Sequence, residues 1–290
     1  MNPRAVLLTD LDNTLFSWID YFAPSIRALV EALSSAAGVP ECEVYEQLRD
    51  VHRRYSAAEH PRVVDELEMC RNRDPGEREA LALLGYEAFE QARTVHLKTY
   101  PGVAATLTRL REHGVVVVGV TSSSVYDAVS RTEALGLATL LDTIVAWEGI
   151  PGVDLPSRTA LARRVVPVMT GRLKPSRIPY QIALAWCGVE CDVPVWVVGD
   201  SIANDLVPAR EIGARTVWAR YGHAYDPANL ETVKRVTFWS AEKIKSAYDF
   251  SILEPDETID EFGRLINLVV GDDVPITTHP MYANSGPSRA

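Results

Sequence analysis

The sequence predicts an α/β protein with a doubly wound, mainly parallel, Rossmann-like sheet and an all-helical segment inserted after the first strand. The first observation is an apolar run at residues 6–8, which has no polar face and is typical of a strand buried on both sides. The second is residues 17–98, where apolar residues recur at helical spacing and no strand pattern intervenes. The third is the alternation of helices and strands beyond residues 100–102, which favours parallel strands joined by right-handed crossovers.

The inserted segment is expected to contain four helices. Apolar residues follow helical spacing from Ile19 to Leu33, and the Gly-Val-Pro sequence at 38–40 ends this first helix. The other three are predicted at residues 44–55, 63–69 and 81–97. The expected organisation is therefore an α/β core made of residues 1–16 and 99–270, a helical domain at 17–98, and a polar C-terminal tail at 271–290.

The remainder of the core alternates between the two kinds of element. The run of valines that begins at Val115 is the clearest strand, because it is almost entirely β-branched. Further pattern analysis predicts strands at residues 115–120, 143–146, 193–198, 215–219 and 248–253. Helices are predicted at residues 103–113, 126–135, 158–166, 175–186, 205–212 and 257–269.

Composition limits the classes of partner. A chain of 290 residues with 47% hydrophobic residues can bury a large core. Its formal charge of −10 argues against sequence-independent binding of nucleic acid, but a small anionic substrate needs only local positive charge. No apolar run approaches the ~20 residues that span a bilayer, and the start of the chain lacks a signal-peptide pattern. We therefore expect no membrane partner and a cytoplasmic location.

The four cysteines are too few to suggest a disulfide framework in a chain of this length. Cys187 and Cys191 lie four residues apart, but no two further ligands stand nearby. Two packed thiols at a helix end are therefore favoured over a zinc site.

Carboxylates follow two of the predicted strands. Asp10 and Asp12 come directly after the first strand, and a Gly-Asp pair that includes Asp200 follows the strand at 193–198. The carboxyl ends of parallel strands form the ligand crevice of such sheets, so these groups are expected to meet there. Mg²⁺ prefers a sparse set of oxygen ligands, which Asp10 and Asp200 would provide. Taken singly, each acid also fits a turn or a helix cap, as does Asp205 at the start of the next helix.

Polar groups of a second kind lie between these acids. Thr121 and Ser122 follow a strand and precede a helix, where a hydroxyl and backbone N–H groups can hold phosphate oxygens. Lys174 stands just before the proline that opens a helix and can balance the carboxylates. Serines are also ordinary caps and most such lysines are solvated, so the inference depends on the joint occurrence of all four signals in order.

With these four segments, the chain resembles the haloacid dehalogenase superfamily of hydrolases. The resemblance covers the expected core, and the helical insertion is similar to the cap of the phosphoglycolate-phosphatase-like branch. Ser123 departs from many relatives, which carry Asn there. The matching motifs are Asp10-Leu-Asp12-Asn-Thr14, Thr121-Ser122, Lys174-Pro175, and Gly199-Asp200 with Asp205 in the GDxxxxD form.

The resemblance implies a Mg²⁺-dependent phosphatase that acts on a small phosphorylated metabolite. Asp10 would attack phosphorus and form an aspartyl-phosphate, while Asp12 would protonate the leaving oxygen and later activate water. Asp12 also favours a phosphatase or phosphotransferase, because dehalogenase and phosphonatase branches lack the second Asp. The other implied roles are phosphate binding by Lys174, Thr121 and the Ser122 amide, and metal binding by Asp10, Asp200, the Asp12 carbonyl and, in support, Asp205.

Two alternatives remain open at this stage. One is a mutase that returns the phosphoryl group to a sugar, and the other is a non-catalytic phospho-acceptor or phosphate-binding relative. Receiver modules also gather acids at strand ends, but they are shorter and lack a helical insertion. Substrate contacts are expected from the cap, with candidates Phe16, Trp18, Tyr21, Arg53, Arg54, Arg71 and Arg73, and with His52, His60 and His96 more often structural.

Overall fold

The fold was analysed in a computed structural model, which describes residues 3–153, 161, 163–188 and 192–271. Seven strands form one sheet in the order β4-β3-β2-β1-β5-β6-β7, and each neighbouring pair is parallel. The predicted doubly wound parallel sheet is therefore confirmed. Strand bounds are Ala5–Thr9 (β1), Val115–Ser124 (β2), Thr143–Trp147 (β3), Val166–Val168 (β4), Val195–Gly199 (β5), Arg215–Ala219 (β6) and Glu257–Ile259 (β7).

Strand β1 lies at the centre of the sheet, between β2 and β5, and all five of its residues are buried. Leu7 belongs to the core on one face, and Val6 and Leu8 belong to the core on the other. This double burial explains why the strand has no polar face in the sequence. The first face packs against α6 (Val103–Glu112), α7 (Val125–Ala134) and α12 (Leu265–Val270), and the second against α8 (Ile178–Cys187) and α9 (Val207–Glu211).

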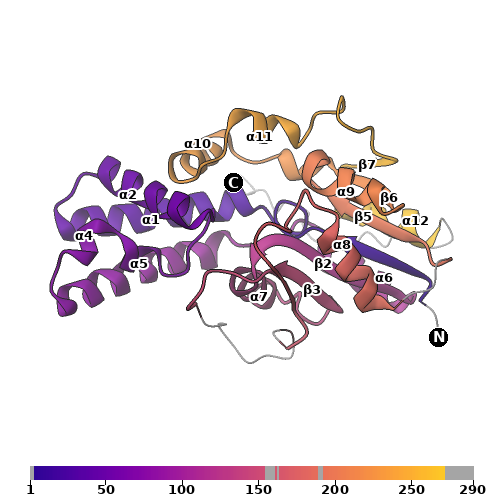
Figure 1. Cartoon of the computed structure of the whole chain (residues 1–290), viewed down its shortest axis with the longest axis horizontal. Coiled ribbons are helices and arrows are strands. Elements are labelled where there is room, and N and C mark those ends of the chain that lie inside the picture. Colours follow the sequence, from indigo (N-terminus) through magenta and orange to yellow (C-terminus); the bar gives the residue numbers. More distant parts are fainter. Residues whose placement is uncertain (1–2, 154–160, 162, 189–191, 272–290) are drawn as a thin grey trace, which may run out of the picture.

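Residues 18–96 form five helices and no strand, and they lie together at one end of the molecule (Figure 1). Helix α1 starts after Ser17, whose side chain accepts a hydrogen bond from the Asp20 N–H, and it ends at Gly38 in the left-handed conformation. The predicted third helix is two short ones. The helices are α1 (Trp18–Ala37), α2 (Glu41–Tyr55), α3 (Val63–Glu66), α4 (Glu68–Arg71) and α5 (Pro75–His96).

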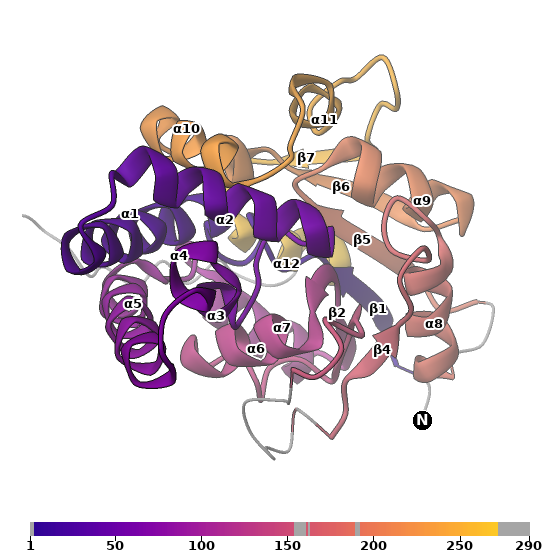
Figure 2. The same ribbon diagram turned by 60° about the vertical axis from the view of Figure 1, so that its left-hand side comes forward.

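Helix α10 (Pro227–Val236) packs on α1 and α2, although it lies far from them in the sequence (Figure 2). Arg27 of α1 donates hydrogen bonds to Thr232 and Asn229 of α10, at 3.0 and 2.8 Å. The short helix α11 (Ala241–Ser246) follows. The pattern analysis did not predict these two helices. A segment from the C-terminal half of the chain therefore covers the inserted helices.

Several predicted elements differ from the structure at the C-terminal end. Residues 248–253 form turns instead of the predicted last strand, and Phe250 and Ile252 are exposed and do not pair with the sheet. The last strand is β7, and only its final residue is buried. The closing helix therefore begins later than predicted, as a 3₁₀ turn (Phe262–Arg264) followed by α12.

The segment after β3 also differs from the expectation. Within the additional helix predicted at 158–166, residues 158–160 and 162 lie outside the described residues. Residues 161, 163 and 164 form turns, and the last residue begins β4. Strand β4 has three residues with Pro167 in the middle, and a proline is tolerated there because β4 is an edge strand. The proline also interrupts the β-branched run by which a strand is recognised in the sequence. Helix α8 begins three residues after Pro175, and the predicted 205–212 helix is a π-helical turn (Ile202–Leu206) followed by α9.

Candidate active site

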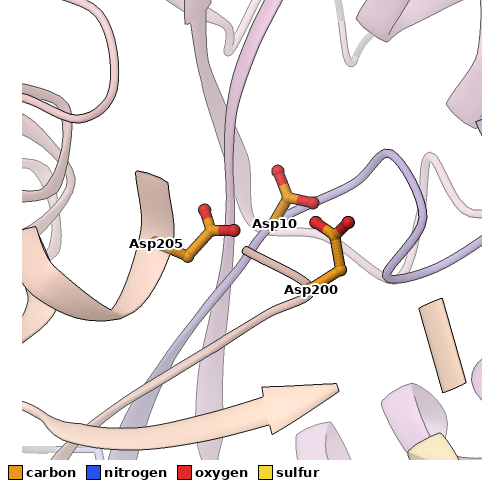
Figure 3. A group of neighbouring side chains, drawn as sticks. All are labelled: Asp10, Asp200 and Asp205. Carbon is orange, nitrogen blue, oxygen red and sulfur yellow. The ribbon is translucent and has the colours of Figure 1, made fainter. Parts of the chain in front are cut away.

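Three carboxylates meet at the carboxyl end of the sheet, as Figure 3 shows. Asp10 follows β1, Asp200 follows β5, and Asp205 lies in the π-helical turn after it. One oxygen atom from each of the three lies within 4.8 Å of the other two. Asp10 and Asp200 are far apart in the sequence, and the pairing of β1 with β5 brings them together. Such a group can hold a hard divalent cation.

Lys174 lies between two of these acids. Its Nζ is 2.6 Å from Asp10 Oδ1 and 2.6 Å from Asp205 Oδ1, and all three side chains are at least nine-tenths buried. The Tyr180 hydroxyl donates a further hydrogen bond of 3.0 Å to Asp205. Lys174, which was predicted to lie just before a helix, therefore faces the acids and not the solvent.

The burial of several acids in one place perturbs their protonation. Burial raises the pKa of Asp10 to about 7, with Lys174 opposing this shift and Asp205 adding to it. Burial also raises the pKa of Asp200 well above its usual range, and the nearby Asp10 charge acts in the same direction. Burial opposes the charged form of Lys174, but Asp10 and Asp205 together hold its pKa well above normal. The site therefore carries more acid than its single lysine balances, which favours a bound cation.

Asp205 is positioned by its neighbours, while Asp200 is not. The Ser201 N–H donates to Asp205 Oδ2 at 3.1 Å, and Lys174 and Tyr180 occupy the other oxygen. Among the described residues, no hydrogen bond reaches the Asp200 carboxylate, so it is the freer ligand. Gly199 is required here, because a Cβ at this position would overlap the Asp205 side chain.

The hydroxyl of Thr14 links the first and last motifs. It donates to Asp10 Oδ2 at 3.0 Å and accepts from the Asp200 N–H at 3.1 Å. The threonine of DxDxT therefore fixes Asp10, the nucleophile candidate, relative to the strand that precedes Asp200.

Asp12 faces the end of β2. Its Oδ2 accepts from the Thr121 hydroxyl at 3.2 Å and from the Ser123 hydroxyl at 2.7 Å. Ser122 is exposed and lines the same cavity. The expected loop at Thr121 and Ser122 is strand instead, because β2 continues to Ser124. Sequence reasoning treated Ser123 only as a departure from relatives, whereas it contacts Asp12 directly.

These residues line a cavity of about 940 Å³. The lining also includes residues of the inserted segment and of the C-terminal half, among them Trp18, Tyr225, Phe238 and Trp239. Phe16 and Tyr21 are buried and do not line the cavity. The predicted contacts on the helices do not line it either. The residues outside the lining are Arg53, Arg54, Arg71, Arg73, His52, His60 and His96.

The arginine candidates instead have local partners. Arg53 lies 3.8 Å from Asp50, and Arg54 lies 3.2 Å from Glu66. His52 contacts the Val236 carbonyl of α10, and burial lowers its pKa to about 4. Sequence reasoning missed Glu59 and Trp239, which do line the cavity. No local motif marks either of them, because only the tertiary fold brings them to the site.

Comparisons with known proteins identify the family of this chain. Residues 5–213 match the haloacid dehalogenase-like hydrolase family, and the chain belongs to that family. A relative, the glyceraldehyde 3-phosphate phosphatase of Methanopyrus kandleri (strain AV19), is 28% identical over 266 residues, which are 89% of this chain and 96% of the relative.

Two solved structures support the fold. A HAD phosphatase from Thermococcus onnurineus has a TM-score of 0.55 at 18% identity, with 93% of this chain and all of that one covered. A 2-haloacid dehalogenase from Pseudomonas syringae pv. Tomato DC3000 has a TM-score of 0.53 at 19% identity, with 92% and 98% covered. At these identities the two show the fold alone. In the described part of the chain, no helix is both long and apolar enough to span a membrane.

Proposed function

We propose that this protein is a Mg²⁺-dependent phosphatase that hydrolyses a small phosphorylated metabolite through an aspartyl-phosphate on Asp10. The observation that carries the proposal is the cluster that Asp10, Asp200 and Lys174 form at one end of the sheet. Membership of a hydrolase family and similarity to a protein named as a phosphatase support the reaction class. The second acid, Asp12, supports phosphate chemistry because departing alkoxide needs a proton donor.

The carboxylates fit a magnesium ion. Asp10 and Asp200 offer oxygen atoms within 4.8 Å of each other, and burial raises the pKa of both. A divalent cation relieves their repulsion and favours the ionised forms. We propose Asp10, Asp200 and the Asp12 carbonyl as ligands, with Asp205 in support because its oxygens already accept other bonds. When bound, the ion would neutralise charge on the phosphoryl oxygens.

In the first step, an Asp10 carboxylate oxygen attacks phosphorus and the bond to the leaving oxygen breaks. The Asp12 carboxyl transfers its proton to that oxygen, so the product leaves as an alcohol. Phosphate-monoester hydrolysis needs acceleration of up to ~10²¹-fold, or roughly 29 kcal/mol. General acid–base help supplies only ~10²–10⁴ of this factor. Positioning and charge neutralisation must supply the rest.

In the second step, water attacks phosphorus of the aspartyl-phosphate and Asp12 takes a proton from that water. The bond to Asp10 breaks and inorganic phosphate leaves, which returns both acids to their initial states. Lys174 stays beside Asp10 throughout and opposes the growth of negative charge at the phosphoryl group. Thr121 and the Ser122 amide are the proposed phosphate contacts at the end of β2.

We propose the domain division that the sequence suggested, with a core at 1–16 and 99–270, a cap at 17–98, and a tail at 271–290. The tail lies outside the described residues. Residues 227–236 belong to the core in this division, but the contacts of α10 with α1 favour grouping them with the cap. The cap and this segment together would exclude water from the cavity and select the leaving group.

The cavity wall favours a substrate with one phosphate and an uncharged remainder. Aromatic side chains contribute to the lining, and the rings of Trp18 and Trp239 contact each other there. In the described part of the lining, Lys174 is already paired with two acids, and the other basic side chain is His223. A cytoplasmic location without a membrane partner belongs to the same proposal. The absence of a nucleic-acid partner also belongs to it and is supported by the charge of −10.

A panel of phosphate monoesters tests the proposal, with released phosphate as the readout, with Mg²⁺ and with a chelator. We expect Mg²⁺-dependent release that Asp10→Asn abolishes and that Asp12→Asn lowers by ~10²–10⁴. The matched control is Asp260→Asn, which removes an exposed acid that pairs with Arg220. Wild-type turnover by Asp10→Asn would exclude the nucleophile, and transfer to a second sugar without phosphate release would favour a mutase.

A further inference from the structure

Arg131 of α7 is the largest fully buried side chain among the described residues, with 2% exposure. Its Nη1 lies 2.6 Å from Glu59 Oε1 and 2.8 Å from the Tyr21 hydroxyl. The same nitrogen lies 3.4 Å from Asp12 Oδ1. A guanidinium at this depth is costly unless acids face it, and here one of the two acids is the proposed proton donor.

The position of Arg131 follows from the start of its helix. Helix α7 begins where β2 ends, with Ser124 as the N-cap that accepts from the Asp127 N–H. Side chains of a helix lean toward its N-terminus, so an arginine in the second turn reaches back toward the strand end. That strand end is where Thr121 and Ser123 hold Asp12.

The two oxygens of Asp12 have different surroundings. Oδ2 accepts from the Thr121 and Ser123 hydroxyls. Oδ1 is buried and has no hydrogen-bond partner among the described residues, and Arg131 is the cation that faces it. Nε and Nη2 of Arg131 also lack partners in the described part of the chain. A structural arginine at this depth normally has its donors satisfied, so the unused donors favour a role at the site.

Glu59 binds the same nitrogen of the guanidinium that faces Asp12. It lies in the segment between α2 and α3 and lines the main cavity. Its oxygens accept from Trp18 Nε1 at 2.6 Å and from the Tyr21 hydroxyl at 3.0 Å, in addition to Arg131. With three donors, Glu59 is fixed in place, and it belongs to the proposed cap while Arg131 belongs to the core.

We propose that Arg131 is a positioning residue that orients the Asp12 carboxyl for proton transfer, and that Glu59 of the cap fixes the guanidinium in that position. This inference rests on the proposed phosphatase function. The alternative is that the pair only braces the cap against the core, with no effect on Asp12.

The leaving group distinguishes the two roles. A nitrophenolate leaves readily as an anion, so hydrolysis of 4-nitrophenyl phosphate needs little help from a proton donor. An alkyl phosphate has a poor leaving group and depends on Asp12 for its proton. A positioning role for Arg131 therefore affects kcat for the alkyl ester far more than kcat for the aryl ester, whereas a brace affects both equally.

The experiment measures kcat and KM for an alkyl phosphate and for 4-nitrophenyl phosphate with Mg²⁺. Arg131→Met is expected to lower kcat for the alkyl ester at least ~10-fold more than for the aryl ester, in the same sense as Asp12→Asn. Glu59→Gln, which keeps the acceptor shape but removes the charge, is expected to show the same bias with a smaller factor. Arg131→Lys is expected to restore part of the alkyl-ester rate, because it returns the positive charge.

Arg93→Met is the matched control. Arg93 is paired with Glu90 at 2.8 Å and contacts Ser130 one residue before Arg131, but it does not contact Asp12. It is expected to change both kcat values equally. Equal losses on both esters for Arg131→Met and Glu59→Gln would overturn the positioning role. If Arg131→Met does not fold, Arg131→Lys and Glu59→Gln decide in the same way. Failure of the wild type to hydrolyse any monoester of the panel would instead overturn the proposed function.

Discussion

Replacement of Lys174 by methionine probes the charge balance of the site. The substitution keeps most of the side-chain volume and removes the ammonium group between Asp10 and Asp205, which lies 2.6 Å from each. The acids then remain buried without their cation. We expect a large loss of stability and of turnover, and we expect the stability loss to depend on pH.

The magnitude follows from burial. The side chains of Lys174, Asp10 and Asp205 are 4%, 9% and 2% exposed, so the pair falls in the buried class and not among surface ion pairs. Removal of one partner of a buried pair costs about 3–5 kcal/mol. At roughly 2–4 °C per kcal/mol, the unfolding midpoint should fall by roughly 6–20 °C at pH about 8. Loss of one electrostatic contact to the phosphoryl group should lower kcat by ~10²–10³.

The sign of the pH effect follows from Asp10. Burial raises the pKa of this acid to about 7 in the folded chain, compared with 3.8 as its ordinary value. At pH about 5.5, the folded state can therefore take up a proton on Asp10 when the lysine is absent, which relieves the repulsion. The loss caused by Lys174→Met should be smaller there than at pH about 8.

Thermal unfolding at both pH values, with a chelator present, measures this difference. Lys234→Met is the control, because Lys234 is paired with Glu231 at 2.7 Å on the surface and should contribute only about 0–1 kcal/mol. A loss for Lys174→Met no larger than for Lys234→Met, or one that is independent of pH, would refute the reasoning.

Two further predictions concern the same end of the sheet. Because burial raises the pKa of Asp10 to about 7 and that of Asp200 as well, protons compete with Mg²⁺ at low pH, so Mg²⁺ should raise the melting temperature more at pH about 8 than at pH about 5.5. Thermal unfolding with and without Mg²⁺ measures this difference. A Mg²⁺-induced rise in melting temperature that is equal at both pH values, or larger at pH about 5.5, would speak against these ligands. Gly199→Ala should lower both stability and kcat, because a Cβ would displace Asp205, whereas Gly213→Ala, at a left-handed position with open space around it, should lower stability alone. Retained kcat in Gly199→Ala would count against the role given to Asp205.

The sequence was sufficient for the central strands of the sheet and for the acids at its edge, because both depend on local pattern. A strand buried on both faces is apolar throughout, and parallel strands bring their carboxyl ends to one edge. Asp10, Asp200 and Lys174 could therefore be expected to meet before any distances were known. The need for Gly199 has the same local origin, since it lies directly beside the turn that carries Asp205.

Other parts of the cavity lining could not be predicted in this way. Trp239 follows α10, which packs on the inserted helices, and Glu59 is held by Arg131, which lies 72 residues further along the chain. Periodicity in the sequence does not record such long-range contacts. The short edge strand β4 was missed because Pro167 breaks its pattern, and residues 248–253 were taken for a strand because apolar residues alternate there while remaining exposed. Whether such a short segment forms a strand depends on its tertiary contacts more than on its local sequence.

The covalent step is the central claim, and it can be measured directly. The wild-type protein is quenched with acid during steady turnover of a monoester with Mg²⁺, and the peptide that contains Asp10 is analysed by mass spectrometry. The account predicts a phosphoryl group on Asp10 that is absent from the Asp10→Asn variant. An unmodified Asp10 under conditions of rapid phosphate release, or a phosphoryl group on a different residue, would contradict it.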